Sequence, residues 1–229
     1  MGLLRSIIGA SGLRVMVAWM LTPDDKSTDG KFVSYLKNSH KWSRYDANLF
    51  EQLRDLLTNR EKRQVSIIEG TELLPNAEYF SAHVPDSSSG RITWFESLSQ
   101  RAQGSDLVFL DPDNGLEVKS KPYGRKDSSK FLYWREVEAL WSSGKSLLIY
   151  QHFIREERFK FIQRMLGELR ARTPGSLVEA FSTPHVLFLT ALQPMHQCFH
   201  VVIIDSVQKN WKGQIQHWEL TRAQQAFLP

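Results

Sequence analysis

The sequence contains a single cysteine, Cys198, among its 229 residues. One thiol excludes an internal disulfide and any zinc site built from several cysteines, and it fits a reducing cytoplasm. Long apolar runs are also missing, because no stretch reaches the ~18 uninterrupted apolar residues that a membrane-spanning helix needs. Residues 1–10 are apolar but are interrupted by Arg5 and lack a cleavage pattern, so no secretory signal is expected. These absences predict a soluble, cytoplasmic protein without a membrane partner.

A glycine-rich phosphate-binding turn is missing as well. Gly9 and Gly12 precede the first apolar strand, predicted at residues 13–21, whereas a phosphate-binding turn follows its strand and opens a helix. The loop after that strand is instead the acidic segment Thr22-Pro23-Asp24-Asp25. The first strand therefore carries no nucleotide motif of this kind.

An excess of charge is nearly absent, since 29 Lys and Arg against 25 Asp and Glu leave a formal charge of +4. Such a weak excess is compatible with a DNA or RNA partner but does not require one. The bases are concentrated in residues 38–45, 118–130 and 154–172. These segments could lie along a nucleic-acid backbone, or they could be ordinary solvated surface.

Short apolar runs alternate with amphipathic segments along the whole chain, and no repeat or linker divides it. We predict one domain over residues 1–229, an α/β three-layer Rossmann-like sandwich around a mostly parallel sheet of about seven strands. The last two strands, separated by residues 193–197, are expected to pair as a C-terminal antiparallel hairpin. Strands are predicted at 13–21, 64–68, 77–82, 107–110, 146–150, 177–181, 186–192 and 199–205. Helices are predicted at 31–37, 46–57, 92–99, 133–142 and 154–172.

The fold is expected to be organised around residues 106–117. Four consecutive apolar residues, 107–110, indicate a strand buried on both faces and therefore central in the sheet. The turn Asp111-Pro112-Asp113-Asn114-Gly115 follows at the carboxyl end of that strand, where open α/β sheets bind their ligands. With Glu117 it holds three carboxylates, which need water, a cation or a substrate's donors nearby. We interpret this turn as the edge of an active site; the alternative is a solvated turn that caps the strand.

Other candidate site residues also follow predicted strands. Glu69 ends the strand at 64–68, where an acidic residue suits a ribose hydroxyl pair. The loop at 118–130 is rich in bases and could hold a phosphate-bearing substrate, or it could be a solvated flap. His185, His196 and His200 are too irregularly spaced to predict a metal site. The candidate substrate-binding residues are Glu117, Lys119, Tyr123, Arg125, Lys126, Gln151, His152 and Phe153.

The order of predicted elements resembles the class I S-adenosylmethionine-dependent methyltransferase fold, a seven-stranded sheet whose final strand is antiparallel. Asp111-Pro112 resembles the Asp-Pro turn of the three-Cys-motif partner family and of large-subunit ribosomal RNA adenine-N6 methyltransferases. The resemblance implies that Asp111 and the Pro112 carbonyl accept hydrogen bonds from an exocyclic amine, with Asp113 and Asn114 completing the catalytic turn. It implies S-adenosylmethionine as cofactor, held by Thr22, Asp24, Asp25 and Glu69. Asp113 and Asn114 replace the motif's second proline and its stacking ring, a role that Tyr123 or Phe153 could take.

Three alternatives remain open from the sequence. Asp111-x-Asp113 also suits a nucleotide-sugar glycosyltransferase, in which two carboxylates hold a divalent cation. Pro112-Asp113 with Glu117-Val-Lys119 weakly suits a nuclease. The missing glycine turn favours an inactive scaffold that binds nucleic acid or protein. No pattern in the sequence fixes the oligomeric state.

Overall fold

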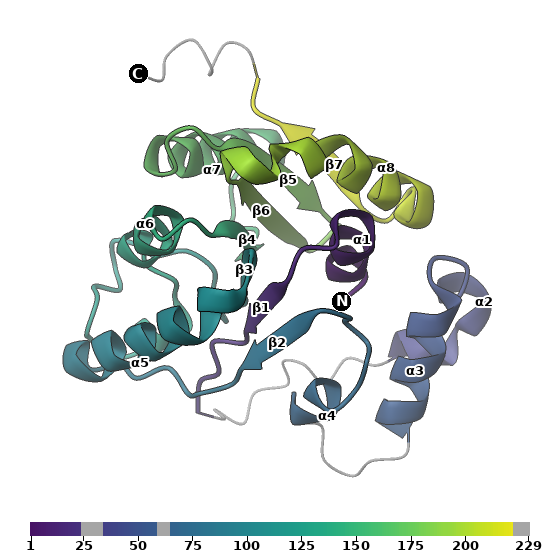
Figure 1. Cartoon of the computed structure of the whole chain (residues 1–229), viewed down its shortest axis with the longest axis horizontal. Coiled ribbons are helices and arrows are strands. Elements are labelled where there is room, and N and C mark those ends of the chain that lie inside the picture. The colour runs from purple at the N-terminus through teal and green to yellow at the C-terminus, as the bar shows by residue number, and fades with distance from the viewer. Residues whose placement is uncertain (24–33, 59–64, 222–229) are drawn as a thin grey trace.

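The computed structural model describes residues 1–23, 34–58 and 65–221, and a seven-stranded sheet forms its centre (Figure 1). The strands are β1 (Val15–Ala18), β2 (Ala77–Phe80), β3 (Leu107–Leu110), β4 (Ser146–His152), β5 (Leu177–Ser182), β6 (Val186–Leu192) and β7 (Gln216–Glu219). The α-helices are α1 (Gly2–Ser11), α2 (Ser39–Trp42), α3 (Ala47–Thr58), α4 (Ser66–Glu69), α5 (Ser88–Arg101), α6 (Trp134–Ser142), α7 (Arg158–Arg172) and α8 (His200–Trp211). Short 3-10 helices cover Ser34–Lys37, Ala102–Gly104, Ser128–Lys130 and Pro194–Phe199.

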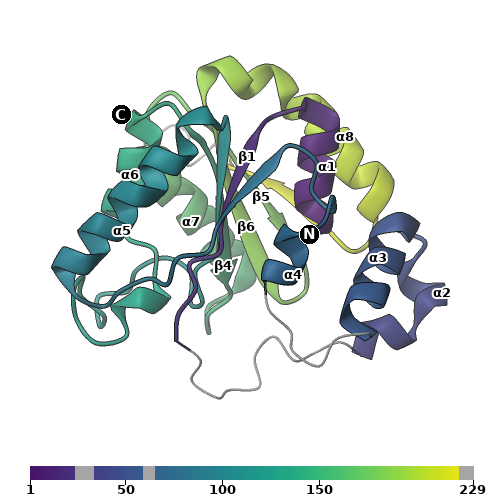
Figure 2. The ribbon, with the colours of Figure 1, turned by 60° about the horizontal axis from the view of Figure 1, so that its bottom comes forward.

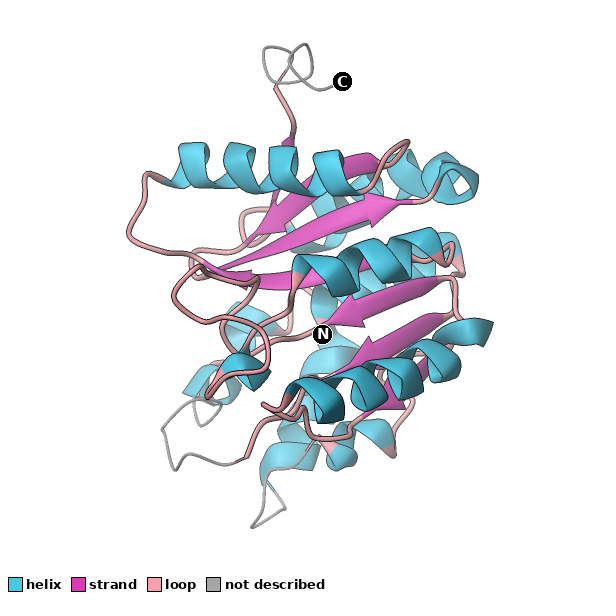
Figure 3. Cartoon of the chain, turned by 90° about the vertical axis from the view of Figure 1, so that its left-hand side faces the viewer, coloured by secondary structure: helices cyan, strands magenta, loops and turns pink. Residues whose placement is uncertain are grey.

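The strand order is β2-β1-β3-β4-β6-β5-β7. The first four strands in this order are parallel to one another, whereas β6 runs antiparallel to both β4 and β5, and β7 runs antiparallel to β5. Figure 3 shows strands running in both directions through the one sheet. The predicted central strand is confirmed, because β3 is paired with β1 on one side and β4 on the other.

Helices cover both faces of the sheet and give three layers (Figure 2). One face packs Met16, Val108 and Leu147 against apolar residues of α5, α6 and α7. Residues that alternate with these, such as Val17 and Phe109, pack on the other face against α1 and α8. Because successive strand residues face opposite sides, the central strands need apolar residues at every position. The predicted Rossmann-like sandwich is confirmed.

Several helix ends follow local sequence signals. Gly12 adopts a left-handed conformation, φ 68°, that ends α1. The Asp46 carboxylate caps α3 as predicted, by accepting from the Leu49 amide at 2.9 Å. It also forms an ion pair with Arg5 at 2.8 Å, which joins α1 to the start of α3. The helix predicted at 154–172 begins later, at Arg158, because Glu157 accepts from the amides of Phe159 and Lys160.

The strand predicted at 64–68 is wrong. Residue 64 lies outside the described residues, and Ser66–Glu69 form the single helical turn α4. Ile67 is buried while Ile68 is only partly buried, so the run buries one side of a turn. Short apolar runs such as this one do not distinguish a strand from a buried helical turn. The helix predicted at 31–37 is described only from residue 34, where it is a 3-10 helix.

The strand predicted at 199–205 is also wrong, and so is its hairpin with 186–192. These residues begin helix α8, in which Val201 and Val202 are exposed while Ile203 and Val207 are buried. Burial four residues apart is the helical period, which overrides the strand preference of a β-branched run. The antiparallel hairpin is formed instead by β5 and β6, joined by residues 183–185. The edge strand β7 was not predicted, because Gln216–Glu219 contains no apolar run.

No helix within the described ranges is long and apolar enough to cross a membrane.

Candidate functional site

Three loops meet at the carboxyl ends of β1, β3 and β4. The Asp111 amide donates to the Ala18 carbonyl at 3.1 Å, which holds the start of the turn against β1. The Thr22 hydroxyl donates to the Asp113 carboxylate and joins the loop after β1 to the same turn. Gln151, near the end of β4, accepts from the Leu116 amide at 2.8 Å through Oε1. Residues that the sequence placed at separate strand ends are therefore neighbours at one edge of the sheet.

Gly115 allows the acidic turn to pack closely on β4. Its φ of 86° lies in the left-handed region, and a Cβ atom here would lie 2.5 Å from Gln151 Oε1. The Gln151 amide is held in place because its Nε2 atom donates to the His152 carbonyl at 2.9 Å. A side chain at position 115 would therefore clash with a fixed group, so the turn requires glycine there.

Asp111 is the most perturbed carboxylate of this edge. Burial is the main cause that raises its pKa to about 7; the positive amino terminus opposes this rise and the charge of Asp113 adds to it. The residue as a whole is nevertheless partly exposed, while Pro112 beside it is buried. A carboxylate that changes charge near neutral pH next to an opening can accept hydrogen bonds or a proton from a ligand.

The raised pKa of Asp111 predicts a pH-dependent stability. A carboxyl whose pKa rises on folding contributes stability that is complete below its unfolded value and is lost as pH rises through about 7. We expect Asp111→Asn to increase the free energy of unfolding at about pH 8 by about 2 kcal/mol. This is less than the free energy that the whole pKa shift would give, because the residue is partly exposed. Urea unfolding at about pH 4 and about pH 8 measures this difference. The exposed control Asp55→Asn should show none, and an Asp111→Asn variant without a pH-dependent gain would contradict the burial effect.

A second polar group lies beside β1 and β2. Trp19 Nε1 donates to Glu69 Oε1 at 3.0 Å, and the Trp19 ring stacks on Tyr79 with centroids 6.1 Å apart. The buried Tyr79 hydroxyl has no hydrogen-bond partner in the part of the chain that the structure describes. Burial, and then the charge of Glu69, raise the pKa of Tyr79. Met20 follows with a φ of 49°, an uncommon backbone conformation for a residue other than glycine.

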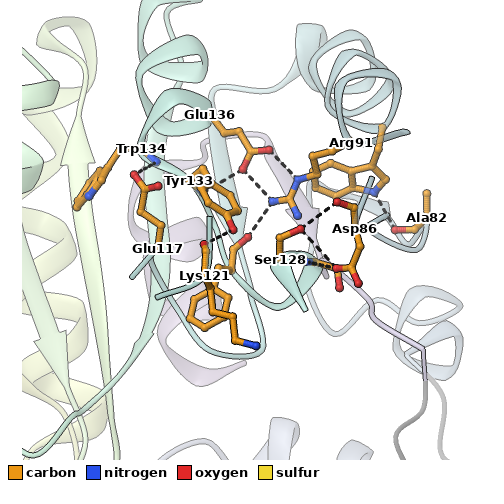
Figure 4. A network of polar contacts seen from close by, with 12 residues as sticks. Ala82, Asp86, Arg91, Glu117, Lys121, Ser128, Tyr133, Trp134 and Glu136 are labelled. Carbon is orange, nitrogen blue, oxygen red and sulfur yellow. Dashed lines mark hydrogen bonds and ion pairs between the residues drawn. The ribbon is translucent and has the colours of Figure 1, made fainter. Parts of the chain in front are cut away.

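The loop that follows the acidic turn is fastened to the domain (Figure 4). Asp86 accepts from the amides of Asp127 and Ser129 at 2.9 and 2.8 Å, which lowers its pKa in spite of burial. The Tyr133 hydroxyl donates to the Lys121 carbonyl at 2.8 Å. These bonds fix residues 121–130 at both ends of the segment, so the loop is an anchored part of the fold.

A buried ion pair lies at the centre of this network. Arg91 of α5 and Glu136 of α6 form two parallel bonds, 2.7 Å from Nε and 2.8 Å from Nη2, with both side chains 2% exposed. Arg91 Nη2 also donates to the Phe131 carbonyl, and Glu136 accepts from the Tyr133 amide. One charge pair therefore joins α5, α6 and the end of the loop (Figure 4).

The predicted substrate-binding residues fall into two groups. Glu117 is turned away from the acidic turn, because its carboxylate accepts from the Trp134 amide at the start of α6. Phe153 packs edge-on against Phe161 beneath Arg158, and Tyr123 packs edge-on against Tyr133 beneath Arg135. The exposed members are Lys119, Arg125, Lys126 and His152, and Asn114 of the predicted catalytic turn is exposed as well. Asp24 and Asp25, predicted for cofactor binding, lie outside the described residues.

Two groups of residues in the structure were not predicted from the sequence. Trp19 and Tyr79 fall within the strands predicted at 13–21 and 77–82, and only their position beside Glu69 distinguishes them. Glu179, His200 and His217 come from β5, α8 and β7 and meet in the structure, although no spacing in the sequence relates them. Within the described residues this is the only group of three such side chains close enough to share an ion, and it does not include Asp111 or Asp113.

The fold and this edge together define a Rossmann-like α/β protein whose candidate site lies at the carboxyl ends of β1, β3 and β4. No family model, no curated protein and no solved structure matches the chain.

Proposed function

We propose that the chain is an S-adenosylmethionine-dependent methyltransferase that acts on an exocyclic amine of DNA or RNA. The observation that carries this proposal is Asp111, a half-buried carboxylate with a pKa raised to about 7, directly before Pro112 at the end of the central strand β3. An Asp-Pro turn at this place is the part of the chain that resembles amino-group methyltransferases. Carboxyl ends of parallel strands are where such folds bind ligands.

The sheet topology supports the same proposal. Strand β6 is inserted antiparallel between β4 and β5, next to four parallel strands. The resemblance to the class I methyltransferase fold was drawn from the order of predicted elements, in a seven-stranded sheet with an antiparallel strand near its end, and the position of β6 fits that pattern. The extra antiparallel edge strand β7 and the helical turn α4 depart from that pattern.

Glu69 and Tyr79 fit the ribose of the proposed cofactor. The two hydroxyls of a ribose can donate to a carboxylate and accept from a phenol. Here the Glu69 carboxylate lies near a buried Tyr79 hydroxyl that lacks a partner among the described residues. S-adenosylmethionine, when bound, supplies an electrophilic methyl group. Trp19 would fix the Glu69 carboxylate through its indole N–H.

The amine would be held by the acidic turn. Asp111 accepts one N–H, and the Pro112 carbonyl accepts the other, since the bond that it accepts from the Gly115 amide is a long one, 3.4 Å. These bonds orient the nitrogen lone pair and raise its electron density. If the methyl group of bound S-adenosylmethionine were transferred from the sulfonium sulfur to this nitrogen, leaving a neutral thioether, the nitrogen would have to lose a proton, and Asp111 could take it because its pKa lies near neutrality.

Exposed bases beside this edge suit a nucleic-acid backbone. Lys119, Arg125 and Lys126 are exposed on the anchored loop that follows the acidic turn. Lys121 differs from them because it is paired with Asp127 at 2.7 Å. We assign the three exposed bases to phosphate contacts, which would make binding weaker at higher salt concentration. The single cysteine fits action in the cytoplasm.

Calorimetric titration with S-adenosylmethionine tests the cofactor assignment. We expect one site in the wild type and an affinity about 10-fold lower in Tyr79→Phe, which removes only the hydroxyl and so one hydrogen bond. Tyr45→Phe is the matched control, because the Tyr45 hydroxyl bonds Arg44 on a different part of the molecule. A wild type that binds no S-adenosylmethionine would favour the inactive scaffold, and equal affinity in Tyr79→Phe would remove Tyr79 from the site.

A further inference from the structure

Glu179, His200 and His217 form a cluster far from the acidic turn. Glu179 lies on β5, and His200 is the first residue of α8. His217 lies on β7, where it pairs with Phe181 of β5. Figure 1 shows α8 beside β5 and β7. Three strand spacings, about 14 Å, separate β5 from β3 across the sheet. The cluster is therefore separate from the candidate site at the end of β3.

The geometry of the cluster is that of metal ligands. Glu179 Oε2 lies 3.1 Å from His200 Nε2 and 2.8 Å from His217 Nε2, and all three ligand atoms lie within 4.8 Å of one another. Two ligands bound to tetrahedral zinc at ordinary bond lengths are about 3.3 Å apart. The two Glu–His distances are within a few tenths of an ångström of this value, and a shift of no more than about 1.5 Å would bring the two imidazole nitrogens to it.

Burial distinguishes this cluster from a solvated ion pair. The Glu179 side chain is 0% exposed, whereas those of His200 and His217 are 22% and 12% exposed. Both imidazoles share one carboxylate oxygen, and the buried Glu179 Oε1 has no hydrogen-bond partner among the described residues. The buried hydroxyl of Thr190, directly opposite Glu179 in the β5–β6 register, is unpartnered in the same sense. Buried polar atoms without partners are unfavourable and indicate a missing ligand or water.

We propose that Glu179, His200 and His217 bind a divalent transition-metal ion, and that zinc is the ion they match. Two imidazoles and a carboxylate are a recognised zinc ligand set that leaves a fourth position open. Glu179 Oε1 and the Thr190 hydroxyl can bond a water in that position or orient the ligand oxygen. His217 also borders a surface cavity of about 660 Å³, lined by Asp205 and Lys209 of α8 and by Gln216 of β7, which gives an ion a route in.

Metal binding would also link β5, α8 and β7 to one another. The three ligands come from separate elements, and β7 is a short edge strand whose one strand neighbour is β5. An ion shared by β5, α8 and β7 stabilises the folded state, because these ligands are not held together in the unfolded chain. The expected signature is a melting temperature that rises with zinc.

The test uses the full chain, freed of metal by a chelator and titrated with Zn²⁺ alone. We expect one equivalent to bind and to raise the melting temperature. His200→Gln and His217→Gln should each lower the affinity at least ~100-fold and abolish the thermal shift, since each removes a ligand. His185→Gln, an exposed histidine outside the cluster, is the matched control and should bind as the wild type does.

Substitution with Co²⁺ gives a second readout that does not depend on stability. Bound at this site, Co²⁺ should show visible absorption that the two glutamine variants lack, and excess Mg²⁺ should not displace it, because Mg²⁺ prefers oxygen ligands. A wild type without saturable Zn²⁺ binding would overturn the proposal. So would a folded His200→Gln or His217→Gln variant that binds one equivalent with less than a ~10-fold loss of affinity.

Discussion

Replacing Glu136 with glutamine is expected to lower the free energy of unfolding by about 3–5 kcal/mol, because a buried charge then loses its partner. The Arg91 side chain is 2% exposed and donates both of its short ion-pair bonds to this one carboxylate. An amide keeps the shape and accepts one bond but leaves the positive charge uncompensated. Urea unfolding monitored by tryptophan fluorescence measures the loss.

Two further variants separate charge from shape in this ion pair. Glu156→Gln breaks the exposed pair with Arg164, which is 2.6 Å long, and should change stability far less because solvent screens it. The double variant Arg91→Met/Glu136→Leu removes both charges and should be more stable than Glu136→Gln alone. If the double variant is instead the less stable one, the geometry of the paired bonds matters more than the uncompensated charge.

Substitution of Asp111 should have the largest effect on activity. Asp111→Ala is expected to lower kcat/KM for methyl transfer to single-stranded nucleic acid by about 10²–10³-fold, the effect of losing one contact made in the transition state. Asp111→Asn should keep part of the activity, because an amide oxygen still accepts a hydrogen bond. In the wild type the rate should rise with pH through about 7 as Asp111 ionises, and this rise should vanish in Asp111→Asn.

Asp113 distinguishes this mechanism from metal-dependent sugar transfer. If Asp111 orients an amine, Asp113→Asn should be mild, since an amide oxygen can still accept from Thr22. If the two carboxylates hold a cation, Asp111→Asn and Asp113→Asn should both abolish turnover together with Mn²⁺ dependence. Radiolabelled methyl transfer and nucleotide-sugar turnover, with Asp55→Asn as the unaffected control, decide between the two. Inactivity of the folded wild type in both assays would favour a binding module.

The sequence predicted the central strands correctly, because a strand that is buried on both faces is apolar at nearly every position. Residues 107–110 and 146–149 are apolar or buried throughout, so their place in the centre of the sheet could be inferred. Val201 and Val202 misled the prediction, because β-branched residues favour strands unless, as here, they face solvent on a helix. Strand β7 could not be predicted, since its polar residues pair at the sheet edge through backbone bonds.

The candidate site was predictable only in part. The acidic turn that contains Asp111 and the end of β4 that contains Gln151 could be inferred to meet, because parallel strands bring their carboxyl ends to one edge. The direction in which each side chain points could not be inferred. Glu117 is the example, because its carboxylate caps α6 instead of facing the acidic turn. The group of Glu179, His200 and His217 depends on an antiparallel edge pairing and a helix start that the sequence did not predict.

The insertion of β6 between β4 and β5 sets an order for folding during synthesis. When the ribosome has made residues up to Ser182, β5 has no neighbour, because the strand that joins it to β4 has not yet been made. Until Val186–Leu192 emerges, the apolar edge formed by Leu147, Leu148 and Ile149 has unpaired backbone groups. A nascent chain that pauses at this stage would expose an aggregation-prone edge. Strands β4 and β5 become parts of one sheet only after β6 has been synthesised.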